Sequence, residues 1–584
     1  MNKNLKGIPL GIDNFKELID KNAYFVDKSL LIEKVINNTS KIMLFTRPRR
    51  FGKSLNFSML KCFLENPECR KFDNEAQSYE YLFKELDIAE EKALLAEHQE
   101  RYPLLNFSFK KIKANHWQEA AYLLKEEIAR EYKRHRYLLD SELLSDFEKN
   151  EYQKLMRKEA QIFNYSSAIK ELTDYLKRYF NEKSIVLIDE YDTPLHYAKL
   201  NGYYNEMLNF MRALMVDGLK GNDSLEKGVV TGIMKISQES IFSAFNNPET
   251  NTIIDSFCAD KFGFTEAEVK EMLAYYSISD QLDTVRDWYN GYLFGDRIVI
   301  YNPWSILNYV KSNPRQPKTY WNNTGDPELI KEALQLDQKK GKEYLEKLYQ
   351  GQSLTVEVDS NIIYDYVFND VDKALSFLLH SGYLKAEQCS EQYQKYRLSI
   401  PNREIRLIFK KILANWFNFE EQSGDLIVDM LNSLINGDLS SFEIHLQDLI
   451  LVSSSYYDAA ASTRVLSEKG QEKERQENFY HGLILGLMTY LSDQYYLESN
   501  KEYGLGRADI VLLPKDKDQN AFVMEFKNEY TTSDISAAAA AEKAIQQINE
   551  QKYAAALKKQ GLKKVYKLGI GFKGKELALK TEIE

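Results

Sequence analysis

The stretch that most constrains this chain is KIMLFTRPRRFGKSL, which occupies residues 41–55. An apolar run at its start predicts a short buried strand, and apolar residues beyond its end recur at helical spacing. Between them lies a basic turn that ends in Gly52, Lys53 and Ser54, the GK[ST] close of a Walker A loop. Glycine lets the backbone approach a phosphate, helix N-terminal N–H groups point at the anion, lysine adds charge, and a serine hydroxyl suits Mg²⁺. The stretch therefore predicts a strand, a phosphate-binding loop and a helix.

The loop departs from the full pattern GxxxxGK[ST] at its first position, where Arg47 stands in place of glycine. Its proline also makes it stiffer than usual. A basic turn that simply ends a strand is the alternative interpretation, so a second element is needed. If the loop binds a nucleotide, we expect the contacts to come from Arg50, Phe51, Gly52, Lys53, Ser54 and Leu55.

The second element is SIVLIDEY, residues 184–191. Its apolar, mostly β-branched run predicts a buried strand that ends in Asp189 and Glu190, as a Walker B strand does. The carboxyl ends of parallel strands line the ligand crevice, so we expect Asp189 to reach the Mg²⁺ that Ser54 binds. Glu190 is then the catalytic candidate that orients or deprotonates water. A buried strand with two solvated acids is the alternative, but the two elements in this order predict a site for ATP and Mg²⁺.

A further buried strand is predicted at GVVTGIM, residues 228–234. Thr231 lies at its end, where it is a candidate to sense the γ-phosphate, although a turn residue that ends the strand explains it equally well. GTP is disfavoured, because the Asn-Lys pairs at Asn2 and Asn500 lack the aspartate of an NKxD base-reading motif.

The remaining sequence of the first half supplies supporting elements. YPLLNFSF (102–109) predicts another strand, and the charged residues 117–180 predict a helical insertion. Tyr24 and Asp27 precede the loop and are candidates to flank the base, but a core tyrosine and a helix cap are the better interpretation.

The middle of the chain gives weaker signals. Residues 260–350 are rich in aromatic side chains with Asn, Gly and Pro punctuation, which suggests a lid on the ATPase core. From residue 370 to 417 the order helix, strand, strand, helix is that of a winged helix, a module that binds nucleic acid or partner domains.

A third stretch with chemistry begins near residue 477 and has the predicted order αβββαβ. In AFVMEFK, side chains alternate, so Val523, Glu525 and Lys527 share one face. A hairpin would bring Asp509 beside Glu525. Two carboxylates with a lysine suit Mg²⁺-assisted phosphodiester hydrolysis, the acids as metal ligands and the lysine as a catalytic group. Glu477 could add a metal ligand, whereas a solvated charged strand face is the alternative.

Composition sets the broad class. With 584 residues, 44% hydrophobic, the chain is long enough for about three domains. A net charge of −10 restricts nucleic acid contacts to local patches. The four cysteines are scattered, no apolar stretch has membrane-span length, and the first residues lack a signal-peptide core. We therefore expect a cytoplasmic α/β protein without membrane contact.

Together these residues resemble two known families. LFTRPRRFGKS and VLIDEYD are similar to the AAA-ATPase-like family, and GLGRADIVL and VMEFK to the PD-(D/E)XK nuclease superfamily. The resemblance implies Lys53, Ser54 and Asp189 as nucleotide and Mg²⁺ ligands and makes Arg47 part of the family's own loop. It also implies a nuclease triad of Asp509, Glu525 and Lys527, with Ala508 in place of the superfamily's proline.

The resulting prediction is an α/β chain in three parts. Residues 1–260 form a P-loop NTPase parallel sheet with a helical insertion, 261–460 a helical lid and winged helix, and 461–584 a restriction-endonuclease-like αβββαβ domain. We expect an ATPase that gates or drives nucleic acid cleavage, with DNA favoured over RNA and homo-oligomerisation left open. The alternative is a nucleotide-controlled signalling or oligomerisation switch whose last domain binds nucleic acid without cutting it.

Overall fold

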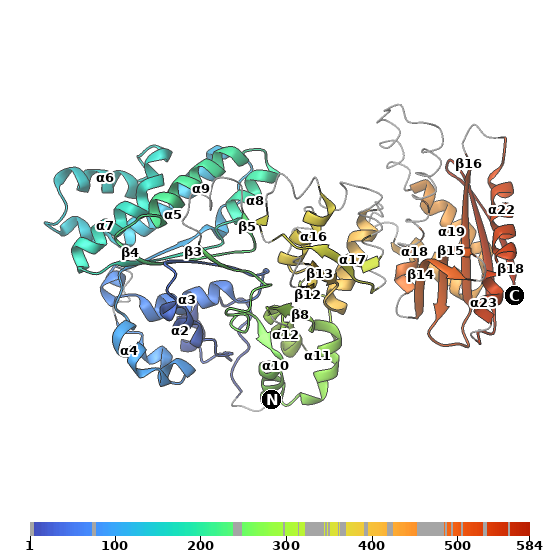
Figure 1. Cartoon of the computed structure of the whole chain (residues 1–584), viewed down its shortest axis with the longest axis horizontal. Coiled ribbons are helices and arrows are strands. Elements are labelled where there is room, and N and C mark those ends of the chain that lie inside the picture. Colours follow the sequence, from blue (N-terminus) through green and yellow to red (C-terminus); the bar gives the residue numbers. More distant parts are fainter. Residues whose placement is uncertain are drawn as a thin grey trace. The chain divides into compact units, whose positions relative to one another are not determined.

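The structure is a computed structural model (Figure 1). It describes residues 5–72, 77–236, 248–295, 298–312, 315–321, 344, 347–348, 351–359, 361–362, 370–390, 395–416, 424–452, 480, 484, 487–491, 494–503, 506–529, 534–558 and 561–584. Two compact units divide the chain: Met1–Gly341 with Ser353–Ile405, and Lys342–Gln352 with Arg406–Glu584. The three-part division made from the sequence stays a prediction.

The core of the first unit is a five-stranded parallel sheet in the order β2-β3-β4-β1-β6. Its strands are β1 (Ile42–Thr46), β2 (Leu104–Ser108), β3 (Ser184–Asp189), β4 (Leu225–Gly232) and β6 (Glu249–Asn251). Strands β1 and β3 are buried at every position, as befits strands covered on both faces. Because the strands run parallel, β1, β3 and β4 end at one edge, with Phe45 opposite Thr231. The first four strands confirm the sequence prediction, whereas β6 was not predicted.

Helices cover both faces of this sheet, with α2, α3 and α4 on one side and α5 to α9 on the other (Figure 1). They are α1 (Phe15–Asp20), α2 (Leu30–Asn37), α3 (Lys53–Leu64), α4 (Lys92–His98), α5 (Trp117–Arg134), α6 (Asp146–Met156), α7 (Ala168–Phe180), α8 (Thr193–Leu200) and α9 (Tyr204–Leu219). Helices α5, α6 and α7 form the insertion predicted at residues 117–180. Helix α3 begins after Gly52, whose φ of 86° is the left-handed conformation that glycine adopts without strain.

The rest of the first unit consists of small sheets and helices. Strands β7 (Phe264–Thr265), β8 (Tyr292–Phe294) and β9 (Ile298–Tyr301) form one sheet, and β10 (Leu354–Glu357), β12 (Lys385–Ser390) and β13 (Lys395–Ser399) another; β5 (Lys235–Ile236) pairs with β11 (Asn361–Ile362). The helices are α10 (Glu266–Tyr275), α11 (Leu282–Tyr289), α12 (Pro303–Lys311) and α16 (Val371–His380). Helix α17 (Arg403–Trp416) begins in this unit, whose last residue is Ile405. Helix α16, the β12–β13 hairpin and α17 follow the predicted winged-helix order, and β10 adds a third strand.

The second unit is built on a mixed sheet in the order β14-β15-β16-β17-β18. Its elements are α18 (Gly424–Asn436), α19 (Leu439–Val452), β14 (Tyr495–Tyr503), β15 (Gly506–Pro514), β16 (Ala521–Glu529), α22 (Ala537–Glu550), α23 (Tyr553–Lys558), β17 (Val565–Lys573) and β18 (Glu576–Ile583). Only β16 and β17 pair in parallel, with α22 between them in the chain. This is the predicted strand and helix order plus an additional strand, β18. The first predicted helix lies mostly outside the described residues.

Strand β16 has two different buried faces, as its alternation predicts. Phe522, Met524 and Phe526 enter a core shared with α18 and α19. Val523 enters a second core with Ile545 of α22. Helix α22 lies very close to the sheet, because a Cβ at Gly571 of β17 would collide with its backbone. The sheet is therefore covered on both faces, and Glu525 lies on the face toward α22.

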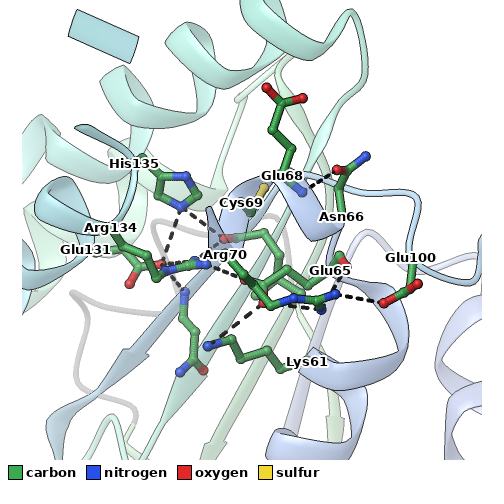
Figure 2. Close-up of polar contacts among 12 residues, drawn as sticks. Lys61, Glu65, Asn66, Glu68, Cys69, Arg70, Glu100, Glu131, Arg134 and His135 are labelled. Atoms are coloured by element: carbon green, nitrogen blue, oxygen red, sulfur yellow. Dashed lines mark hydrogen bonds and ion pairs between the residues drawn. The ribbon is translucent and has the colours of Figure 1, made fainter. Parts of the chain in front are cut away.

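A network of buried charges joins the carboxyl end of α3 to α5 (Figure 2). Glu65, which directly follows α3, is fully buried and pairs with Arg134 of α5, which also pairs with Glu131. Nearby, Arg70 pairs with Glu100 at 2.7 Å. Arg134 draws the pKa of Glu131 down against the effect of burial. Since each of these arginines faces a carboxylate, the network fixes the phosphate-loop helix to the insertion.

Candidate functional sites

Three predicted nucleotide-site residues converge where β1, β3 and β4 end. Asp189 accepts one hydrogen bond from Ser54 Oγ, at 2.7 Å to Oδ2, and one from Thr231 Oγ1, at 2.6 Å to Oδ1. Burial raises the pKa of Asp189, while the Thr231 and Ser54 hydrogen bonds hold it lower. The Ser54 hydroxyl and the buried Asp189 carboxylate are oxygen ligands of the kind that Mg²⁺ takes. The residues present therefore fit a magnesium ion at this position.

Lys53 is buried at the first turn of α3, with 4% of its surface exposed. Its Nζ donates to the backbone carbonyls of Arg47 and Pro48, both at 3.0 Å. Burial lowers the pKa of Lys53, although Glu190 and Asp189 oppose this effect. N–H groups at the first turn of a helix have no partner within the helix. Lys53 and this turn therefore place positive potential where a phosphate would lie.

Arg47, which replaces the first glycine of the motif, points away from the phosphate loop. Its fully buried NH1 donates to the carbonyls of Thr46, at 2.9 Å, and of Asn251 in β6, at 2.7 Å. The guanidinium also lies over the Phe262 ring, 5.1 Å from its centroid. Burial lowers the pKa of Arg47 to about 10. Arg47 therefore fastens the start of the loop to β6.

The other predicted loop contacts differ in where their side chains point. Phe51 is fully buried against Tyr292 and Phe294, with ring centroids 5.0 and 5.4 Å apart. Leu55 packs on the core beneath α3. Phe51 can therefore reach a nucleotide only through its backbone N–H group, whereas Leu55 is partly buried. Arg50 keeps a partly exposed guanidinium at the loop.

Glu190 lies beside this convergence with a strained backbone, since its φ is 53°. Its N–H faces Thr231 Oγ1 at 3.4 Å, and its carboxylate accepts a hydrogen bond from Thr193 at 3.2 Å. The assignment of Glu190 as the water-orienting residue stays a prediction.

Sequence reasoning missed Asp192, two residues further along. It is buried, and its Oδ2 accepts hydrogen bonds from the N–H groups of Ile233, at 2.7 Å, and Met234, at 3.1 Å. Gly232 lies so close that a Cβ there would stand 2.8 Å from Asp192 Oδ1. Asp192 thus shapes the turn after Thr231. The only sequence signal was a third acid in DEYD, and no spacing rule marks it.

The two residues that precede the loop have structural roles. Tyr24 packs against Tyr275, with ring centroids 5.0 Å apart. The Asp27 carboxylate accepts hydrogen bonds from the N–H groups of Ser29 and Asp87, both at 2.7 Å. Tyr24 thus packs against a hydrophobic core, as the structural interpretation predicts. Asp27 is not the cap of α2, because the N-cap residue is Ser29, and Asp27 instead holds the turn before it.

The second unit brings the predicted nuclease residues together. Asp509 Oδ2 accepts a hydrogen bond from the N–H of Phe526, at 2.8 Å, so it lies beside β16. Lys527 Nζ lies 3.5 Å from Glu525 Oε1, which also accepts a hydrogen bond from Gln547 of α22. One acidic pair, one lysine and one amide thus converge on the face of β16 toward α22. Their catalytic and metal-binding roles stay predictions.

Glu525 is the most perturbed acid of this group. Its side chain is 2% exposed, and Oε2 has no hydrogen-bond partner. Burial and then the nearby Asp509 raise the pKa of Glu525 to about 8, against the effect of Lys527. A buried carboxylate oxygen without a donor fits a divalent cation.

The third carboxylate predicted for this site is not placed. Glu477 lies outside the described residues. Within the part of the chain that the structure describes, no three His, Cys, Asp or Glu side chains form a metal-binding group. Of the three carboxylates predicted as ligands here, the structure therefore places Asp509 and Glu525.

The parallel sheet, its phosphate loop and the Ser54–Asp189 contact define the first unit as a P-loop nucleotide-binding protein. Comparison with protein families specifies both ends of the chain: residues 9–242 match the family described as "Predicted AAA-ATPase", and residues 475–582 match the PD-(D/E)XK nuclease superfamily. The chain therefore carries a predicted AAA-ATPase domain in residues 9–242 and a PD-(D/E)XK nuclease superfamily domain in residues 475–582. The two resemblances stated from the sequence are confirmed.

Individual relatives add little about activity. An uncharacterised protein from the vnfD 5′ region of Azotobacter chroococcum mcd 1 is 25% identical over 415 residues, which cover 70% of each chain. A Walker-type ATPase of Pyrococcus abyssi is 14% identical, with a TM-score of 0.33, over 70% of this chain and 99% of that one. None of the helices that the structure describes has the length and apolar character needed to cross a membrane.

Proposed function

We propose that this protein binds and hydrolyses ATP with Mg²⁺ and that its last domain cleaves nucleic acid, with nucleotide gating the cleavage. The observation that carries the ATPase is the double hydrogen bond from Ser54 and Thr231 to Asp189. The observation that supports the nuclease is the convergence of Asp509, Glu525 and Lys527 in a domain of a nuclease superfamily. We favour DNA over RNA as substrate.

In the ATPase site, each residue has a role that follows from its position. The first-turn N–H groups of α3 and the Lys53 ammonium bind the phosphates. Ser54 and Asp189 hold Mg²⁺, which neutralises charge on the β- and γ-phosphates when bound. Glu190, beside Thr231, orients the attacking water. Thr231 senses the γ-phosphate, because its hydroxyl already bonds to Asp189.

In the nuclease site, the two carboxylates would hold a divalent cation, which would supply Lewis acidity toward the phosphodiester. Lys527 stabilises the negative charge that develops on the phosphate. Gln547 fixes one oxygen of Glu525 and so aims the other oxygen at the cation.

ATP hydrolysis by purified parent, Lys53→Ala, Glu190→Gln and Lys92→Ala proteins tests the first half. Lys53→Ala should abolish nucleotide binding, and Glu190→Gln should retain binding while hydrolysis falls by roughly 10²-fold or more. Lys92→Ala changes an exposed lysine and is the matched control. Hydrolysis by Glu190→Gln at the parent rate would remove Glu190 from the mechanism.

Cleavage of labelled DNA and RNA with Mg²⁺, with and without ATP, tests the second half. Glu525→Ala should not cut, while Glu550→Ala, an exposed glutamate at the end of α22, should cut like the parent. If Lys53→Ala cuts like the parent under every nucleotide condition, gating is wrong while the nuclease stands.

A second candidate function is a nucleotide-controlled switch, with or without oligomerisation, whose last domain binds nucleic acid without cutting. It is favoured by the hydrogen bonds that Phe526 and Gln547 already give to Asp509 and Glu525, because such bonds hold both acids without an ion. Under this alternative, Asp509→Ala retains its affinity for nucleic acid and the parent never cuts.

A further inference from the structure

Arg50 of the phosphate loop lies against an aromatic ring of the lid. Its guanidinium lies over the ring of Trp304, 4.2 Å from the centroid. Trp304 belongs to α12, and its indole N–H donates to the carbonyl of Tyr320 at 3.1 Å. Arg50 has a φ of 69°, which is a strained conformation for a residue with a side chain. A strained loop arginine is thus held by a ring that is itself fixed.

A second tryptophan of the lid contacts the neighbouring loop residue. The buried Trp321 indole N–H donates to the backbone carbonyl of Arg49 at 3.3 Å. The backbone N–H of Trp321 donates to Glu404 at 2.9 Å, and Ser305 of α12 donates to the same carboxyl group at 2.8 Å. The lid therefore touches the phosphate loop at two successive residues and is braced by one buried carboxyl group.

The Arg50 side chain can interact with the Trp304 ring or with a phosphate, and the contact with Trp304 is the weaker of the two. A cation over an indole ring gains only a modest stabilisation. A guanidinium bound to phosphate makes charge-assisted, often bidentate hydrogen bonds, which are stronger. Burial lowers the pKa of Arg50, and Glu190 opposes this effect, so the charge of Arg50 lies close to that carboxylate. Phosphates in the loop would therefore compete with Trp304 for Arg50.

We propose that Arg50 is a phosphate-binding residue that leaves Trp304 when ATP enters, and that Trp304 is a positioning residue that holds Arg50 in the nucleotide-free loop. This inference rests on the proposed ATP binding. It predicts that the fluorescence of Trp304 changes when a nucleotide binds. It also predicts that Trp304 weakens ATP binding, because Arg50 must leave the Trp304 ring before it can bind the phosphate.

The test uses intrinsic tryptophan fluorescence and the affinity for a fluorescent ATP analogue in the full chain. ATP should change the tryptophan emission of the parent, and Trp304→Phe should lose that change. Trp288→Phe is the matched control, because the Trp288 ring lies 4.8 Å from the Arg403 guanidinium in a similar pair of the lid. Arg50→Ala should weaken ATP binding by about tenfold to a hundredfold, and Arg50→Lys should recover part of the loss.

The sign of the Trp304 effect separates this role from a purely structural one. Weaker cation–π partners should give tighter ATP binding, in the order parent, Trp304→Phe, Trp304→Leu, by about twofold to tenfold. Thermal melting confirms that each variant is folded. Weaker binding in a folded Trp304 variant, or an emission change of undiminished size in Trp304→Phe, would overturn the inference and leave ATP binding intact. A parent that binds no ATP would overturn the proposed function and this inference together.

Discussion

Helix α3 carries buried charges at both of its ends, and the two ends differ in what those charges face. At the carboxyl end, Glu65 and Arg134 pair directly as part of the network in Figure 2. At the amino end, the hydrogen bonds of Lys53 go to backbone carbonyls, and Arg50 lies on an aromatic ring. The first arrangement is complete without a ligand, whereas the second gains strong partners when a phosphate enters.

This difference separates charges that stabilise the fold from charges that are reserved for a ligand. A buried ion pair costs stability when one member is removed, because the other is left uncompensated. A buried cation whose hydrogen bonds go to carbonyls carries a desolvation cost that those bonds offset only in part, and a bound phosphate offsets more of it. Substitutions at the two ends should therefore change stability in opposite directions.

The largest effect is expected for Arg134→Ala, which leaves Glu65 and Glu131 buried without their cation. It should lower the free energy of unfolding of the first unit by about 3–5 kcal/mol, as measured by urea denaturation followed by circular dichroism. Arg101→Ala, which breaks an exposed pair with Glu182, is the control and should leave the midpoint unchanged. Equal midpoints for the two variants would remove the distinction between the ends of α3.

A change in stability of intermediate size is expected for Glu404, whose buried carboxyl group accepts a hydrogen bond from the backbone N–H of Trp321. Burial raises its pKa to about 7, above the value of roughly 4.5 in the unfolded chain. The protonated folded form is favoured, so its contribution is complete below about pH 4.5 and is lost as the pH rises through 7.

Thermal melting of the parent and Glu404→Gln between pH 5 and 8 measures this contribution. The parent should lose on the order of 2 kcal/mol relative to the variant over that range. Glu357→Gln, an exposed glutamate of β10, should follow the parent. Parallel pH profiles for parent and Glu404→Gln would show that this carboxyl group ionises normally.

The smallest expected change in stability is a gain rather than a loss. Lys53→Met replaces a buried ammonium with an apolar chain of similar length, so stability without nucleotide should rise by about 1 kcal/mol while ATP binding is lost. Urea denaturation with and without ATP measures both, and Lys92→Met is the exposed control. A loss of stability in Lys53→Met would place Lys53 among the fold-stabilising charges.

Sequence alone predicted the parts of the fold that depend on local pattern. The buried strands β1 and β3 and the two faces of β16 follow from apolar runs and alternation. The strand β18 was missed because its residues are mostly half-buried or exposed, so no strong period marks it. Local pattern thus identifies buried strands more reliably than edge strands.

The residues of the candidate sites were likewise predictable only where local pattern or strand order determines their position. Ser54, Asp189 and Thr231 meet because parallel strands must end at a common edge. The contacts of Trp304 and Trp321 with the loop join residues about 250 positions apart, as their numbers in the chain show. No local spacing records such a contact. The inward turn of Arg47 likewise depends on β6, which the sequence did not reveal.

The close approach of α22 to Gly571 has a consequence for the nuclease domain. Gln547, which donates a hydrogen bond to Glu525, belongs to that helix. The absence of a side chain at Gly571 therefore determines how closely the Gln547 amide approaches Glu525. An alanine at Gly571 would push α22 away from the sheet and weaken the hydrogen bond from Gln547 to Glu525. A change of side-chain volume at this glycine would thus alter the surroundings of Glu525 without replacing any ionisable residue.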